Sequence, residues 1–278
     1  MTAEAYRVRG PSAIGGDPRR FWNLARTLAA TDWKVRFYGS ALGYVWSLLR
    51  PLLLFGIVYV VFSEVVGADA GVADYGVILL LAMILYFFFA EVTSGGTTAM
   101  VDRESLLRKI GFPRAVVPLA VALVAAMNLA LNLVVLAVFV VASGVQPRWS
   151  WLALPIPIAL MLVFATGVAL LLSALYVRYR DVRPIWEVLL QALFYATPIL
   201  YPIQAVLGRS ETLATVALCN PIAAIIQESR HLLVGGMSLG EAIGSDALIA
   251  IPLAIIAGVT WLGVVVFDRM APRAAEEL

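Results

Sequence analysis

The chain has 278 residues, of which 62% are hydrophobic and only 14% charged, with a formal net charge of +2. This composition is far more apolar than that of a soluble globular domain, which excludes a water-soluble protein and predicts a membrane protein. The single cysteine, Cys219, and the single histidine, His231, exclude an internal disulfide and a Cys/His metal cluster.

The segment 17–37 predicts an amphipathic helix ahead of the first apolar stretch. Asp17-Pro18 is a good helix start, because a capping carboxylate is followed by proline at the first helical position. Asp32 is the one charged residue on the apolar side of the helical wheel. That side otherwise carries Phe21, Trp22, Leu24, Ala25, Leu28, Ala29 and Trp33. We expect Phe21, Trp22, Leu28 and Trp33 to place this helix in the cytoplasmic membrane interface; the alternative is packing on a soluble partner.

Six apolar stretches are candidates for membrane-spanning helices, since about 20 apolar residues cross the hydrocarbon core. They are residues 44–66, 77–100, 115–142, 152–176, 186–201 and 247–267. The region 211–234 is apolar but interrupted by Cys219-Asn220-Pro221, and proline disfavours a continuous helix there. It predicts a re-entrant helical hairpin before the last span.

The distribution of basic residues supports six crossings with both termini in the cytoplasm. With this topology, 17 of the 20 basic residues face the cytoplasm, and only Arg148, Arg209 and Arg230 lie outside. The fold class is therefore an all-α integral membrane protein with six transmembrane helices. The expected organisation is a cytoplasmic segment 1–42, a transmembrane domain 43–270 and a cytoplasmic tail 271–278.

The sequence contains no phosphate-binding loop for ATP. Such a loop needs a lysine directly after glycine, and the two lysines, Lys34 and Lys109, follow Trp33 and Arg108. If transport is driven by ATP, a separate subunit must supply the nucleotide site.

Several short segments stand out along the chain. They are residues 32–46 (DWKVRFYGSALGYVW), 107–114 (LRKIGFPR), 178–181 (RYRD), 197–202 (TPILYP) and Asn220-Pro221 with Arg230. Together, and in this order, they resemble the ABC-2-type permeases that export O-antigen, capsule, teichoic acid or related cell-envelope polysaccharides such as galactan. Asp102 and Glu104 depart from the family pattern.

The resemblance implies a division of labour between subunits. Two copies of the permease would form a canal, and two copies of a cytoplasmic ATPase would bind ATP and magnesium, so that this chain carries no cofactor and is not itself an enzyme. A coupling helix would dock into the ATPase; its candidates are Asp102, Arg103, Glu104, Leu106, Leu107, Arg108 and Lys109. A solvated loop is the alternative interpretation of these residues, and residues 178–183 would add a second contact.

Aromatic residues are the candidates for lining the canal, because sugar rings stack on aromatic faces. They are Phe55, Tyr59 and Phe62 on the first span and Phe194, Tyr195 and Tyr201 on the fifth. Helix packing and an interfacial aromatic belt are the alternatives. Asn220, Pro221, Glu228 and Arg230 are candidates for an external gate, with a simple surface cluster as the alternative.

Glu91 is an ionisable residue inside the second span, where charge is costly. We expect a structural role against another helix, since no partner base for proton coupling is evident. Asn128 and Asn132 on the third span are expected to form interhelical hydrogen bonds.

The leading hypothesis is therefore ATP-driven export of a lipid-linked polysaccharide across the inner membrane of a bacterium. An ABC-2 exporter of a drug or small lipid is the alternative within transport. A membrane-embedded glycosyltransferase would need clustered carboxylates or a metal motif, and an ion-driven carrier would need more paired intramembrane charges than Glu91 provides.

Overall fold

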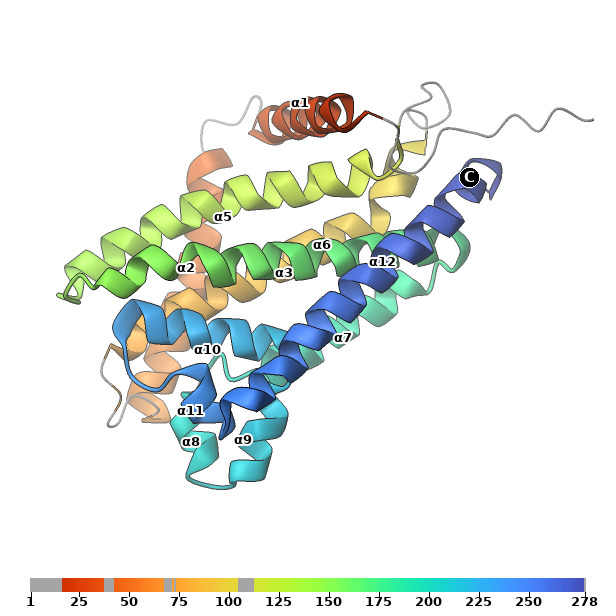
Figure 1. Ribbon diagram of the computed structural model, residues 1–278. Helices are drawn as coiled ribbons and strands as arrows, with labels where there is room; N and C mark the ends of the chain where they lie inside the picture. Colours follow the sequence, from red (N-terminus) through yellow and green to blue (C-terminus); the bar gives the residue numbers. More distant parts are fainter. Residues whose placement is uncertain (1–16, 38–42, 68–71, 73, 105–112, 278) are drawn as a thin grey trace, which may run out of the picture.

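The computed structural model describes residues 17–37, 43–67, 72, 74–104 and 113–277, and these ranges contain helices and no strand (Figure 1). The expected all-helical class is confirmed. Four helical segments are long and apolar enough to cross a membrane. They are α3 (Tyr75–Asp102), α5 (Val116–Ala142), α6 (Pro155–Arg178) with the preceding turn η2 (Trp149–Ala153), and α12 (Ala250–Glu277) with the preceding turn η3 (Asp246–Ile249).

Helix α3 is the centre of the bundle, with 20 of its 28 residues buried. It packs on α5, α6 and α10 (Pro221–Val234). Small residues let the helices approach closely, as is usual where lipid supplies no hydrophobic driving force between them. A Cβ at Gly96 would lie 2.5 Å from the Cβ of Ala169 on α6, and one at Gly263 on α12 would lie 2.1 Å from the carbonyl oxygen of Gly167. The long helices therefore form one tightly packed unit.

Helix α1 (Pro18–Phe37) lies beside α5 at the end of the bundle where α6 and α12 finish (Figure 1). It begins as expected, with the Asp17 carboxylate accepting a hydrogen bond from the Arg19 backbone at 2.9 Å. Ala25 and Ala29 are fully buried, whereas Trp22 is 46% exposed. The apolar stripe thus packs mainly on the chain's own bundle, and Trp22 faces away from it.

Two further apolar helices flank this unit. Helix α2 (Gly43–Val60) continues into a π-helical turn, η1 (Val61–Val65), and α7 (Val182–Ala196) runs back from the end of α6 (Figure 1). Helix α7 ends five residues before the expected boundary at Tyr201. The reason is local, because Thr197 adopts an extended conformation before Pro198, and Pro202 then precedes the short helix α8 (Ile203–Leu207).

The segment between α8 and α12 folds into short helices on a small core of its own. They are α9 (Glu211–Leu218), α10 and α11 (Leu239–Ile243). Asn220 is extended before Pro221, as expected, and its side chain caps α10 by accepting from the Ile222 backbone at 3.0 Å. A capping box of Ser238 and Glu241 starts α11, and the Ser238 backbone N–H holds the pKa of the Glu241 carboxyl below its usual range.

Candidate translocation site

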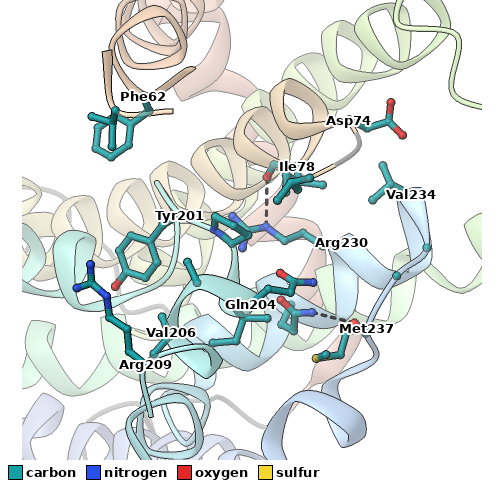
Figure 2. Close-up of a pocket in the computed structure, with 18 of the residues that line it drawn as sticks. Phe62, Asp74, Ile78, Tyr201, Gln204, Val206, Arg209, Arg230, Val234 and Met237 are labelled. Carbon is teal, nitrogen blue, oxygen red and sulfur yellow. Dashed lines mark hydrogen bonds between the residues drawn. The ribbon is translucent and has the colours of Figure 1, made fainter. Parts of the chain in front are cut away.

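One cavity, called here the outer cavity, has a volume of about 910 Å³ and lies where α7 has ended and α3 begins (Figure 2). Its walls come from the end of η1, the first turn of α3, the segment 201–209 and the carboxyl end of α10. The lining mixes aromatic, polar and charged side chains. Those used below are Phe62, Asp74, Ile78, Tyr201, Gln204, Arg209, Gln227 and Arg230.

Arg230 of α10 is 5% exposed and is held by backbone oxygens. Its Nη1 donates to the Pro198 carbonyl at 2.8 Å and its Nη2 to the Ile199 carbonyl at 2.9 Å. Its Nε donates to the carbonyl of Ile78 in the first turn of α3, at 3.3 Å (Figure 2). The ion pairs within the described residues do not include Arg230. The guanidinium therefore joins α10 to the main chain of two other elements, α3 and the segment that follows α7.

The link 197–200, which follows α7, is fixed by side chains from two neighbouring helices. Besides the two bonds from Arg230, the Tyr75 hydroxyl of α3 donates to the Leu200 carbonyl at 2.6 Å. The Asn220 amide donates to the Thr197 hydroxyl at 3.0 Å. Buried carbonyls without donors are costly, so these bonds allow the chain to leave the helical conformation inside the protein.

The six aromatic canal candidates fall into three groups. Phe62 and Tyr201 line the outer cavity, and Figure 2 shows the side chains of Tyr201 and Arg209 extending along the same side of it. Tyr195 is 69% exposed on α7. The remaining three pack within the subunit. Phe55 is buried edge-on against Phe139 and stacked on Tyr59, Tyr59 stacks on Tyr75, and Phe194 stacks on Phe87.

The four gate candidates lie where α10 contacts other elements of the structure. Asn220 and Pro221 connect the start of α10 to the link 197–200, as described above. Glu228 accepts a hydrogen bond from the Leu239 backbone at 3.2 Å and so ties α10 to α11. Arg230 is the only one of the four among the residues lining the outer cavity.

At the opposite end of the bundle, α1 is bound to α3 by two ion pairs. Asp32, the exception on its apolar side, pairs with Arg103 directly after α3. Arg36 pairs with Glu91 at 2.6 Å. The two ion pairs give a partner to Asp32 on the apolar side of α1 and to Glu91 inside the apolar helix α3.

The Glu91 carboxylate is part of a wider polar network. It accepts a second hydrogen bond from the Asn128 amide of α5 at 2.8 Å, and the Trp33 indole donates to Asn128 at 3.2 Å. Asn132 donates back to the Asn128 carbonyl at 2.8 Å rather than to another helix. Glu91 is thus placed where α1, α3 and α5 meet, with partners that the sequence did not reveal.

The coupling candidates are described only in part. Asp102 is the last residue of α3. Arg103 follows and makes the ion pair with Asp32. Glu104 is described, whereas Leu106, Leu107, Arg108 and Lys109 lie outside the described residues.

Several lining residues were missed by the sequence reasoning. Asp74, Gln204, Arg209 and Gln227 come from three different segments, and no motif joins them. The sequence could have pointed to Arg209 as a site residue, because it is one of the few basic residues expected outside the cytoplasm. Which residues surround it could not be predicted, since this depends on where α7 ends.

Comparison with protein families identifies the class to which this helical protein belongs. Residues 23–234 match the model described as ABC-2 type transporter, and the chain belongs to that family.

Two similar proteins cover nearly all of the chain. An O-antigen export system permease protein RfbA from Klebsiella pneumoniae is 27% identical over 258 residues, which cover 92% of this chain and 95% of the relative. A protein of the same name from Myxococcus xanthus is 28% identical over 278 residues, covering 100% of this chain and 99% of the relative.

The Arg230 contacts predict a clear effect on stability. Arg230→Met leaves three carbonyls without their donor, and at about 1 kcal/mol per hydrogen bond we expect a loss of about 3 kcal/mol. The stability of Arg230→Lys should lie between those of the wild type and Arg230→Met, because one ammonium group cannot donate to three carbonyls with the geometry of a guanidinium. Thermal unfolding of the detergent-solubilised protein measures the difference.

Arg209→Met is the matched control, because Arg209 lines the same cavity but is exposed. It should unfold at the wild-type temperature. If Arg230→Met is as stable as the wild type, the carbonyl contacts of Arg230 do not hold the link 197–200 in place.

Proposed function

We propose that this chain is the membrane subunit of an ATP-driven exporter that moves a lipid-linked cell-envelope polysaccharide out of the cytoplasm of a bacterium. The observation that supports this most is the family match combined with full-length similarity to proteins named O-antigen export permeases. The outer cavity adds a chemical argument. Aromatic faces, amides and a tyrosine hydroxyl are the groups that bind sugar rings and their hydroxyls.

The proposed topology has six crossings of the inner membrane and both termini in the cytoplasm. Four spans are α3, α5, α6 and α12. We assign the other two to α2 with η1 and to α7. In this topology α9 and α10 form a re-entrant hairpin on the outer side, residues 1–42 hold the interface helix, and 271–278 form the tail.

The energy would come from a separate ATPase that binds ATP and magnesium, since the chain lacks a phosphate-binding loop. Two permease copies and two ATPase copies are the proposed assembly, with the canal on the twofold axis. Exposed apolar residues on α2 and α7 suit contacts with the second copy or with lipid; examples are Leu53, Ile57, Ile185 and Val188.

The two ion pairs of α1 suggest how movement reaches the spans. The segment after Arg103 is the proposed ATPase contact, and Arg103 is bound to Asp32 of α1. A push on this segment would be passed to α1 and, through Arg36 and Glu91, to the middle of α3. In the proposed mechanism, α1 and the end of α3 therefore move together during the ATPase cycle.

Depletion of the protein in its native cell tests the function. We expect long lipid-linked glycans to accumulate inside the cell and the surface polysaccharide to disappear, because synthesis continues without export. Thin-layer analysis of extracted lipids and surface labelling of glycan measure both. Re-expression of the wild-type chain is the control, and a normal surface polysaccharide after depletion would contradict the assignment.

A charge exchange tests the coupling route. Arg103→Asp places two carboxylates together, and we expect export to fall severalfold while the ATPase subunit still co-purifies. The double variant Asp32→Arg/Arg103→Asp restores an opposite pair and should recover most export, which a surface glycan assay detects. Continued loss in the double variant, with normal expression, would show that this pair does not transmit movement.

A further inference from the structure

A second cavity lies at the other end of the bundle, between the carboxyl-terminal half of α3 and the first turns of α7. It has a volume of about 340 Å³ and is called here the α3–α7 cavity. Its lining is unusually polar for a position beside a membrane-spanning helix. The lining residues are Ser94, Gly95, Thr97, Thr98, Asp102, Arg183, Trp186 and Glu187.

Two hydroxyls in this cavity differ from the other hydroxyls of the same helix. Thr93 and Thr97 donate back to carbonyls one turn earlier, at 2.8 and 2.7 Å. Ser94 and Thr98 line the cavity, are partly exposed, and make no hydrogen bond with the other described residues. Together with Asp102 they recur every fourth residue, which puts all three on one face of α3.

An aromatic ring forms part of the opposite wall. The Trp186 indole N–H donates to the Thr93 hydroxyl at 3.1 Å, and its ring lies 6.2 Å from that of Phe89. These contacts fix the orientation of the indole. Beside it on α7, Arg183 and Glu187 form an ion pair at 3.0 Å.

The charges of the lining select the class of ligand. One guanidinium and two carboxylates, those of Asp102 and Glu187, give a formal charge of −1, which disfavours a diphosphate. Free hydroxyls, carboxylates and a fixed aromatic ring together suit an uncharged ring that carries many hydroxyl groups.

We infer that the α3–α7 cavity binds a sugar ring of the lipid-linked glycan at the cytoplasmic side, before transport. This inference rests on the proposed function, which supplies both the orientation and the substrate. Ser94 and Thr98 hydrogen-bond to sugar hydroxyls, and Trp186 covers one face of the ring. The cavity volume falls in the ordinary range for small-molecule sites, roughly 300–1,000 Å³.

The test uses the full permease–ATPase complex in lipid nanodiscs and measures ATP hydrolysis. Two probes are added in turn: polyprenyl-diphosphate-linked glycan extracted from the producing cells, and polyprenyl diphosphate without sugar. For Ser94→Ala/Thr98→Val we expect the half-stimulating concentration of the glycan lipid to rise about tenfold, from two lost hydrogen bonds. The response to the sugar-free lipid should stay as in the wild type.

Thr166→Val is the matched control, since its hydroxyl already donates to the Leu162 carbonyl within α6 at 2.7 Å. Variants of Trp186 provide a second test that does not depend on the stability of the double variant. Trp186→Leu should weaken the response to the glycan lipid more than Trp186→Phe does, because phenylalanine retains an aromatic face.

Each remaining outcome contradicts the inference. An unchanged response of the double variant, or an equal change with both lipids, overturns the sugar site while leaving the proposed function intact. Loss of ATPase co-purification in the double variant would show instead that the cavity receives a segment of the ATPase. A wild-type complex that the glycan lipid fails to stimulate overturns the proposed function and the sugar site together.

Discussion

The hydrogen bonds from Arg230 to three backbone carbonyls are the interaction on which the region around the outer cavity depends. Irregular backbone at membrane depth is tolerated only where protein or water satisfies its polar groups. Here a single guanidinium, aided by Tyr75 and Asn220, satisfies the link that follows α7. Because α7 can end there, the chain turns away and leaves the outer cavity open between α3, α10 and the segment 201–209.

The two ends of the bundle are built on different physical principles. At the outer end, a buried cation holds main-chain carbonyls, so the geometry depends on fixed hydrogen bonds. At the other end, α1 is joined to α3 by ion pairs that are partly exposed, Asp32 with Arg103 and Arg36 with Glu91. Such pairs contribute little stability and exchange more easily. In the proposed topology the end held by Arg230 faces outward and the end with α1 faces the cytoplasm, so a rigid outer region and a more adaptable inner one would suit a permease driven by a cytoplasmic ATPase.

The sequence predicted the helical class, the four long spans and the break at Asn220-Pro221, because hydropathy and proline act locally. The break before Pro198 was missed, since the apolar stretch continues through it to Tyr201. It also predicted the amphipathic helix, but it left Asp32 and Glu91 without partners, since Arg103 and Arg36 are 71 and 55 residues away along the chain. Arg230 was named as a gate candidate, yet its role depends on carbonyls, which every residue has and no motif reveals. Other lining residues of the outer cavity were missed because they come together only after folding. They are Asp74, Gln204, Arg209 and Gln227.

The most direct test of the account is photo-crosslinking in cells that are exporting polysaccharide. Benzoylphenylalanine replaces Tyr201 in the outer cavity, and in a separate variant it replaces Val138, an exposed apolar residue of α5. The account predicts that light produces a glycan-bearing permease from the Tyr201 variant while export is active, and none from the Val138 variant. Active export with no glycan captured at Tyr201, or equal capture at both positions, would contradict the proposal that the groups of the outer cavity bind the polysaccharide during export.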